Sequence, residues 1–388
     1  MEYNGIIITG TSGAGKSTIA KRFCETYKIF QIVQAVTTRQ PREDDITNQY
    51  LHITKEEFKK IEEKLLIKSE YRGESYGVTH DALQQVINND KIPILIITPQ
   101  SIHELEMKED RKHQYLTIFL DAPDEMLDER LKARGTEINE NIKKQREKDR
   151  KYIEYCLYII KNLNIEDTTE LLHCLWDYRN IGGMLPKRVI ELMIKCGTLL
   201  ENANKNNIQG ASYDLVLGDE YFQKGLIKSL DEKKPFIMME PGGYVLISSK
   251  EIANLPRDIA GRFDITVSLF CKGVILSNGP QIDPGFRGKL FCLLFNTSNE
   301  KIQLKRDEHF ATIEFIKLFE PTAPYTGKYQ NKITIGDYLP NIVKASAINE
   351  LIKDVKKLKK EEWWIKILPL VVSIFALILA IVSLIGNK

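Results

Sequence analysis

The chain has 388 residues, which is enough for two or three domains. Hydrophobic residues make up 43% of it and charged residues 28%, a balance that excludes a disordered chain and is typical of globular protein. The formal net charge of +2 gives no sign of a strongly basic face, so no nucleic acid partner is expected. The six cysteines are scattered without a CxxC pair, which predicts reduced thiols and no zinc site.

A glycine-rich loop follows the first apolar run of the chain. Residues 6–8 are all isoleucine and predict a buried strand, and a helix is expected from residue 16 to residue 27. The loop between them has the spacing GxxxxGK[ST], in which backbone N–H groups surround phosphates. The positive end of the following helix favours the same anion.

This spacing gives each residue of the loop an expected role. Lys16 would contact the β- and γ-phosphates, and the Ser17 hydroxyl would be a ligand of Mg²⁺. We therefore expect a nucleoside triphosphate to be bound by Gly10, Thr11, Ser12, Gly13, Ala14, Gly15, Lys16, Ser17 and Thr18.

Apolar runs and amphipathic stretches alternate up to about residue 180. Residues 94–97, 116–120 and 158–160 predict buried strands, and residues 124–133, 139–153 and 167–176 predict helices. Such alternation is typical of an α/β fold with a parallel sheet and helices on both faces. The sequence thus predicts a first domain over residues 1–180.

Two further motifs in this domain carry a family resemblance. Residues 37–42 read Thr-Thr-Arg-Gln-Pro-Arg, and residues 130–136 read Arg-Leu-Lys-Ala-Arg-Gly-Thr. With the phosphate loop, they make residues 3–178 similar to the guanylate kinase family, a P-loop kinase family that uses ATP and Mg²⁺. The resemblance implies that the phosphate of the acceptor nucleotide is held by Arg39, Arg42, Tyr50 and Tyr76. It also implies catalytic roles for Lys16 and for the lid residues Arg130 and Arg134, which would stabilise the transferring phosphoryl group.

Two departures from the family pattern concern the acceptor base. The family has a serine where Ala35 stands, and it ends a core strand with two acidic residues where residues 94–98 carry none. The acceptor is therefore GMP, another nucleoside monophosphate or a phosphorylated sugar. Two alternatives also stay open at this stage: the arginines of the motif as solvated surface charges, and the two tyrosines as packing residues.

The pattern changes after Gly182 and Gly183, where many short strands separated by turn residues predict an all-β barrel or jelly roll. Residues 184–218, 240–246, 255–262 and 282–288 carry motifs, among them Asp-Pro-Gly-Phe-Arg-Gly, that resemble the dCTP deaminase family. That family belongs with dUTPases to a superfamily of trimeric β-barrels. The resemblance covers residues 184–319 and implies a homotrimer formed through a second domain at residues 183–320.

The positions that carry deaminase chemistry in that family differ here. Leu293 stands in place of the deaminating glutamate, and Val267 and Cys271 replace a serine and an arginine of an active-site segment. Leucine cannot relay protons, so we expect the deaminase activity to be lost. Asp283 is retained, and the resemblance to dUTPases implies a contact with deoxyribose and the attacking water. The alternative is that Asp283 only begins an Asp-Pro-Gly turn.

The C-terminal part predicts a membrane anchor. Residues 367–385 form an apolar stretch of about 19 residues, close to the ~20 that span a bilayer. Trp363 and Trp364 precede it, and the lysines lie mostly upstream, which predicts a single-pass anchor at residues 363–388 with both domains cytoplasmic. Residues 321–362 would be a linker and a basic helix.

These features support three hypotheses. The first is a membrane-anchored, ATP-dependent kinase of a nucleoside monophosphate or similar phosphorylated small molecule. The second is a nucleotide-sensing membrane effector, for instance in phage defence, in which neither domain turns over quickly. The third is a dUTPase-like pyrophosphatase that depends on Asp283.

Overall fold

The computed structural model describes residues 3–42, 45, 49–106, 114–136, 138–277, 279 and 281–338, together with residues 357, 367, 369 and 373. The chain divides into one compact unit at Met1–Asp337 and a second at Tyr338–Lys388. The predicted α/β domain and the predicted β-rich domain both lie in the first unit.

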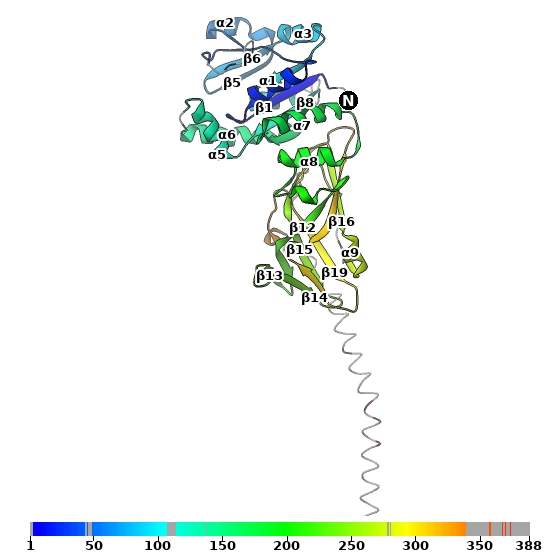
Figure 1. Ribbon diagram of the computed structural model, residues 1–388. Coiled ribbons are helices and arrows are strands. Elements are labelled where there is room, and N and C mark those ends of the chain that lie inside the picture. Colours follow the sequence, from blue (N-terminus) through cyan, green and yellow to red (C-terminus); the bar gives the residue numbers. More distant parts are fainter. Residues whose placement is uncertain are drawn as a thin grey trace, which may run out of the picture. The chain divides into compact units, whose positions relative to one another are not determined.

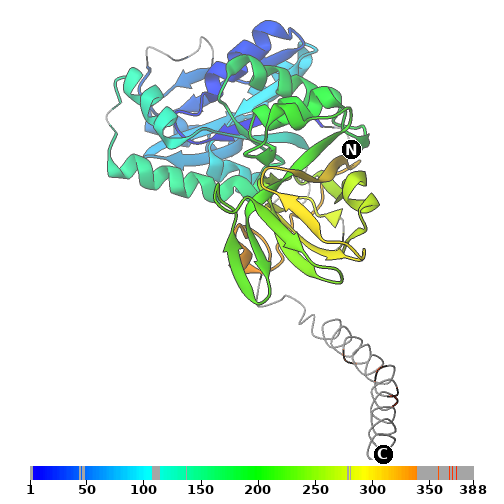
Figure 2. The same cartoon turned by 60° about the horizontal axis from the view of Figure 1, so that its bottom comes forward.

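A five-stranded sheet forms the centre of the N-terminal part (Figures 1 and 2). Its order is β2 (Phe30–Ile32), β7 (Ile92–Ile96), β1 (Gly5–Gly10), β8 (Tyr115–Asp121) and β9 (Tyr158–Lys161). All four pairings are parallel, which confirms the predicted parallel sheet. The three isoleucines of β1 are at most 1% exposed, as expected for a strand covered on both faces.

Helices cover both faces of this sheet. Helix α1 (Lys16–Thr26) contacts β1, β2 and β7, and α7 (Ile165–Asp177) packs against α1, whereas α4 (Pro99–Glu106) contacts β1 and α6 (Glu140–Arg150). The connections β1 to β2 and β7 to β8 run in opposite directions along the sheet, so right-handed crossovers place α1 and α4 on opposite faces. Helix α5 (Asp124–Ala133) has the predicted bounds, and η3 (Lys151–Tyr155) continues α6.

A separate four-stranded sheet lies in the segment between α1 and β7. Its order is β4 (Tyr50–His52), β3 (Ala35–Thr37), β6 (Glu74–Thr79) and β5 (Leu65–Tyr71). Helices α2 (Lys55–Lys60) and η1 (Glu62–Lys64) connect β4 to β5, and α3 (His80–Asn88) follows β6. The sequence analysis did not predict this sheet. Two of its strands have three residues each, which is too short for a periodic pattern to show.

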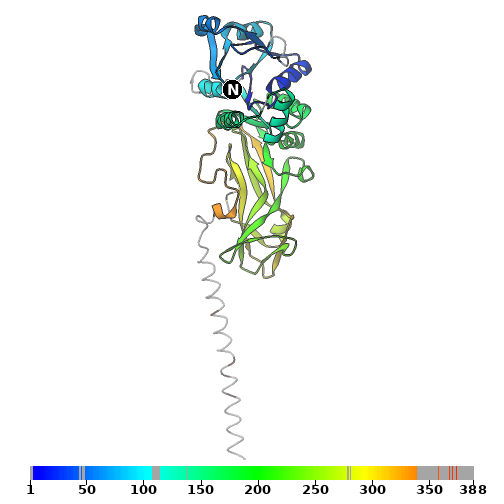
Figure 3. The same cartoon turned by 90° about the vertical axis from the view of Figure 1, so that its left-hand side faces the viewer.

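The second part of the first unit consists mainly of β-strands, coloured green to orange in Figures 1 and 3. A ten-stranded sheet has the order β17-β19-β15-β12-β21-β16-β18, with β10, β11 and β13 attached, and β14 pairs with β20. The bounds are β10 (Gly183–Met184), β11 (Leu199–Glu201), β12 (Ser212–Gln223), β13 (Leu226–Ser229), β14 (Phe236–Met239), β15 (Tyr244–Asn254), β16 (Ile259–Ile265), β17 (Val274–Leu276), β18 (Gln281–Ile282), β19 (Arg287–Asn296), β20 (Ile302–Lys305) and β21 (His309–Lys317). Helices α8 (Lys187–Lys195) and α9 (Val267–Cys271) and the turns η4 (Lys205–Asn207) and η5 (Ile335–Asp337) complete it. The predicted β-rich second part is confirmed.

The segment after β21 packs on this β structure. The Tyr325 N–H donates to the Pro284 carbonyl at 2.9 Å, and the Lys289 N–H donates to the Lys332 carbonyl at 2.9 Å. The cysteines form no disulfide among the described residues.

The predicted membrane location has to be corrected. Among the described residues no helix is long and apolar enough to cross a membrane. The longest described helix, α7, has 13 residues and rises about 20 Å, against the ~30 Å of a bilayer core. The predicted span at residues 367–385 and the basic helix at 345–361 lie, but for four positions, outside the described residues.

Candidate functional site

The loop after β1 requires glycine at three positions. Gly10, Gly13 and Gly15 have φ of +140°, +90° and +88°, a region that side chains with a Cβ rarely adopt. A Cβ on Gly10 would lie 1.9 Å from the Leu120 carbonyl oxygen. Gly15 is also the N-cap of α1, so the loop leads into the positive end of the helix. The backbone is thus shaped to hold an anion.

Lys16 lies inside this loop. Its Nζ donates hydrogen bonds to the carbonyl oxygens of Gly10 at 2.8 Å and Thr11 at 2.9 Å. Burial lowers the pKa of Lys16 to about 8; the charge of Asp149 works against this shift, and that of Arg134 adds to it. A phosphate beside Nζ would compensate the buried charge, because an opposite charge favours the ionised form.

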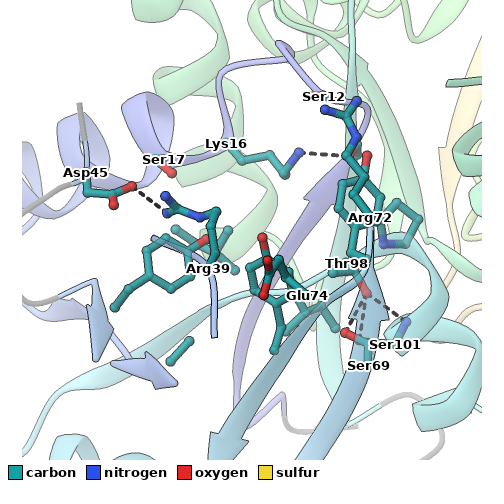
Figure 4. A pocket seen from close by; sticks show the side chains of 18 of the residues that line it. Ser12, Lys16, Ser17, Arg39, Asp45, Ser69, Arg72, Glu74, Thr98 and Ser101 are labelled. Carbon is teal, nitrogen blue, oxygen red and sulfur yellow. Dashed lines mark hydrogen bonds and ion pairs between the residues drawn. The ribbon is translucent and has the colours of Figure 1, made fainter. Parts of the chain in front are cut away.

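A cavity of about 660 Å³ opens from the loop toward the four-stranded sheet. It brings together most of the residues that the sequence singled out. The predicted residues that line it are Gly10, Ser12, Gly13, Gly15, Lys16, Ser17, Thr18, Arg39, Arg42, Tyr50, Tyr76 and Arg134. Figure 4 shows Lys16 and Ser17 from the loop and Arg39 reaching into the same space.

Arg39 is held in place by its neighbours. Its Nη2 donates to Asp45 Oδ1 at 2.7 Å, its Nη1 donates to the Gln40 carbonyl at 2.8 Å, and its guanidinium lies 5.1 Å from the Tyr50 ring centroid. Burial alone would raise the pKa of Asp45, but the hydrogen bonds from Arg39 and from the Arg42 N–H hold it below its ordinary value. Arg39 is 9% exposed, so the reading as a solvated surface charge is wrong for this residue. Arg42 is exposed and lines the cavity.

The two tyrosines lie together at the cavity wall. The ring centroids of Tyr50 and Tyr76 are 6.3 Å apart at 71°. Burial, reinforced by Tyr76, raises the pKa of Tyr50 to about 12. Its hydroxyl therefore stays protonated at neutral pH and can donate to an anion.

Four predicted residues lie outside this cavity. Thr11 Oγ1 donates to Asp121 Oδ1 at 2.9 Å, and the Ala14 carbonyl accepts from Asn162 Nδ2 at 2.8 Å, so both hold the back of the loop. Arg130 Nη2 donates to the Asn162 carbonyl at 2.8 Å, behind the same loop. Asp283 belongs to the second β structure, is exposed, and accepts from Gln281 Nε2 at 3.1 Å.

The structure adds acidic residues that the sequence analysis missed. Asp121 ends β8 beside β1 and binds both Thr11 and Arg150, whose Nε donates to its Oδ2 at 2.9 Å. Asp149 is 2% exposed and accepts from the Tyr71 hydroxyl at 2.9 Å, and burial raises its pKa. Asp121 had a recognisable signal, since the carboxyl end of a parallel strand beside the loop strand is where ligands bind.

The far end of the cavity has a different character. Ala35, Ile67 and Val78 line it from the four-stranded sheet, and Thr98 lines it from the end of β7. Thr98 Oγ1 donates to Ser69 Oγ at 2.9 Å. No carboxylate ends β7, as its sequence already showed. Among the described residues, no group of three or more His, Cys, Asp or Glu side chains could hold a metal ion.

In the second β structure the replaced positions lie at the surface. Val267 is 76% exposed, Phe270 is 68% exposed, and both lie on α9 with the exposed Cys271. Leu293 is half-buried on β19, on the face opposite Cys292 and Leu294.

The comparisons with known proteins divide at the same point as the fold. Residues 2–178 match the family described as Guanylate kinase, and residues 184–318 match the family described as dCTP deaminase-like. A guanylate kinase of Clostridium perfringens is 31% identical over 176 residues, 44% of this chain and 81% of that protein. A dCTP deaminase of Pyrococcus horikoshii is 39% identical over 133 residues, 34% of this chain and 84% of that protein.

Two solved structures are similar to parts of the chain. The crystal structure of guanylate kinase from Anaplasma phagocytophilum is 21% identical, with a TM-score of 0.38, over 46% of this chain and 88% of that chain. The crystal structure of 2'-deoxycytidine 5'-triphosphate deaminase from Agrobacterium tumefaciens is 18% identical, with a TM-score of 0.31, over 35% of this chain and 48% of that chain. On the sequence matches, the chain belongs to the guanylate kinase family through residues 2–178 and to the dCTP deaminase-like family through residues 184–318.

Proposed function

We propose that the chain transfers a phosphoryl group from ATP, with Mg²⁺, to a nucleoside monophosphate or a similar phosphorylated small molecule. One observation carries this proposal: a single cavity is lined both by the phosphate loop and by Arg39, Arg42, Tyr50 and Tyr76. Membership of the guanylate kinase family supports a nucleotide phosphotransferase.

The residues of the loop fit a triphosphate with its metal ion. A Cβ on any of the three glycines would collide with Leu120, Leu127 or Asn162, so only glycine lets the loop pack this closely. Ser17 Oγ lines the cavity and accepts from Gln49 Nε2 at 2.8 Å. Magnesium ions in kinases are held mainly by phosphate oxygens, water and one or two protein groups, so Ser17 suffices as the hydroxyl ligand. The ion would supply neutralisation of the charge on the phosphates.

The protein itself would contribute positioning and charge. Lys16 would exchange its bonds to Gly10 and Thr11 for the β- and γ-phosphates, and Arg134 would approach the transferring group from the lid. Arg130 would act behind the loop through Asn162, although the sequence motif gave it a direct role. Among the described residues Arg130 Nη1 is buried without a hydrogen-bond partner.

At the acceptor, Arg39 and Arg42 would bind the monophosphate with Tyr50 and Tyr76. Both arginine segments converge on Asp45, which accepts from Arg39 Nη2 and from the Arg42 N–H at 2.9 Å. A guanidinium fixed in this way loses little side-chain entropy when it binds a phosphate.

For the second family match we propose a domain at residues 183–320, after a kinase domain at 1–180 and before a linker. We further propose that it has lost deaminase activity, since Leu293, Val267 and Cys271 cannot replace the expected polar groups. We propose a homotrimer through this domain, supported by the family resemblance and by exposed apolar side chains on α9. Light scattering would test it: a monomer, or no effect of Phe270→Asp on the assembly, would contradict the proposal.

The kinase proposal is tested with purified protein, ATP, Mg²⁺ and a panel of monophosphates, with ADP release as the readout. Lys16→Ala should lose the activity, and Lys60→Ala, which removes an exposed lysine of α2, should not. Absence of transfer to every acceptor, or equal activity in Lys16→Ala, would refute the proposal.

A further inference from the structure

The end of the cavity distant from Arg39 has an apolar wall. Ile67 pairs with Val78 across β5 and β6, and the register of β3 places Ala35 opposite Val78, so these residues form one row across the sheet. Ile96 and Ile97 line the same end, and all five side chains are at most 8% exposed. The side chains of this wall can make apolar contact with a planar ring, but they provide no hydrogen-bond donor or acceptor.

A group of three hydroxyls adjoins this wall. Thr98 Oγ1 donates to Ser69 Oγ at 2.9 Å and lies 2.9 Å from Ser101 Oγ (Figure 4). A hydroxyl has one proton, so Thr98, which donates to Ser69, accepts from Ser101. Ser69 is left with its own proton for a ligand, and Ser101 with its oxygen lone pairs. One donor and one acceptor therefore lie on either side of the Thr98 hydroxyl, and the chain of hydrogen bonds polarises the donor.

The carboxylates of the cavity are already in use near the arginine motif. Among its described lining residues these are Asp45 and Glu74. Asp45 is bound to Arg39, and Glu74 Oε2 accepts from Thr38 Oγ1 at 2.6 Å. The backbone of Glu74 lies about 13 Å from Val78 along β6, but only two residues from Tyr76, which pairs with Ser69. The binding of its Oε2 to Thr38, and not its distance from the hydroxyls, is what sets this carboxylate apart from them.

These observations select among the nucleobases. Guanine has three N–H donors on its pairing edge, and cytosine and adenine each carry an amino group. Each donor buried without an acceptor costs about tenfold to a hundredfold in affinity. A 2,4-dioxopyrimidine has one carbonyl beside one ring N–H at this edge, which matches the Ser69 donor and the Ser101 acceptor.

We propose that this end of the cavity binds a 2,4-dioxopyrimidine, so that the acceptor is a uracil or thymine nucleoside monophosphate. The O4 carbonyl accepts from Ser69, the N3–H donates to Ser101, and position 5 of the ring faces the apolar wall. This inference rests on the proposed kinase function and adds the class of its acceptor.

The test compares dTMP, dUMP, UMP, GMP, CMP and AMP as acceptors in the full chain at saturating ATP and Mg²⁺. We expect kcat/KM for the best of the first three to exceed that for GMP by at least about 30-fold. Calorimetric titration of each monophosphate in the absence of ATP measures binding separately from catalysis and should give the same order.

Variants of Thr98 connect the preference to the hydroxyl group. Thr98→Val keeps the shape and breaks the chain of hydrogen bonds, so it should lower kcat/KM for the preferred acceptor about tenfold and leave the KM for ATP unchanged. Thr98→Ser should restore most of the activity. Thr26→Val is the matched control, because this exposed hydroxyl of α1 donates to the Arg22 carbonyl outside the cavity, and it should have no effect.

Preference for GMP, CMP or AMP would overturn the inference and leave the kinase function standing. In that case, loss of the preference in Glu74→Gln would show that the Glu74 carboxylate accepts from the amino group of the base. An unchanged acceptor profile in Thr98→Val would also overturn it. If no acceptor is phosphorylated, the kinase function fails; calorimetry then still decides the base class, and binding of none of the monophosphates would overturn both.

Discussion

Replacement of Arg39 by methionine tests the acceptor half of the site. Methionine has a similar length and no charge, so it keeps much of the packing against Tyr50 and removes the guanidinium. Arg39 has five N–H donors, of which one bonds to Asp45 and one to Gln40, so three are left for a phosphate.

Two charge-assisted hydrogen bonds to a phosphate contribute about 3 kcal/mol or more, because each is worth roughly 1.5–3 kcal/mol. We therefore expect kcat/KM for the acceptor to fall at least about 100-fold in Arg39→Met. The carboxyl of Asp45 also loses its cation, so its pKa should rise toward the ordinary value, and the free energy of unfolding should fall by about 1 kcal/mol.

The assay is steady-state kinetics, first with the acceptor varied at saturating ATP and then with ATP varied at saturating acceptor. The KM for ATP should stay within about twofold, since Arg39 lies on the acceptor side of the cavity. Arg22→Met is the control, because this exposed arginine of α1 pairs with Glu166. The variant should change neither kcat/KM for the acceptor nor the KM for ATP. An equal loss in the ATP constants, or a loss below fivefold for the acceptor, would refute the assignment of Arg39 to the acceptor phosphate.

Three further predictions follow from single contacts. Because Lys16 has a pKa of about 8 and must be protonated to bind phosphate, the KM for ATP should rise as the pH increases from 7.5 to 9.5; a flat profile would contradict this. Gly15→Ala should weaken ATP binding at least tenfold and lower the melting temperature, because φ at this position is +88° and the added Cβ would lie 2.6 Å from Asn162 Nδ2. Calorimetry with a non-hydrolysable ATP analogue measures the affinity, and wild-type affinity in the variant would refute the prediction. Asp258→Ala should cost about 3–5 kcal/mol in urea unfolding, because two buried groups lose their acceptor: the Lys317 ammonium, 7% exposed and 2.5 Å from Asp258 Oδ2, and the Tyr158 hydroxyl, which donates to the same oxygen at 2.6 Å. The combined change Asp258→Leu, Lys317→Met and Tyr158→Phe should recover most of that loss, and a cost below about 1 kcal/mol for Asp258→Ala would contradict the argument.

The sequence by itself determined the local part of the site. The spacing of the loop fixes which residues need positive φ, and the isoleucines of β1 and the helix after the loop follow from short-range patterns. Parallel strands with intervening helices were predicted for the same reason, since each element has its own hydrophobic period. The predicted membrane location was wrong for the described residues. An apolar stretch of near-bilayer length shows that a segment is hydrophobic enough to span a membrane, but it does not show where the segment lies.

The acceptor end needed the tertiary structure. β3 and β4 are three residues long, and β3, β5 and β6 bring Ala35, Ile67 and Val78 into one row although they are up to 43 positions apart in the sequence. The same folding turns Arg130 behind the phosphate loop, directs Arg134 into the cavity, and buries Arg39 against Asp45. Motif spacing identifies residue types that suit phosphate chemistry, but contacts between distant segments decide which of them meet, because they depend on register and packing across the whole sheet.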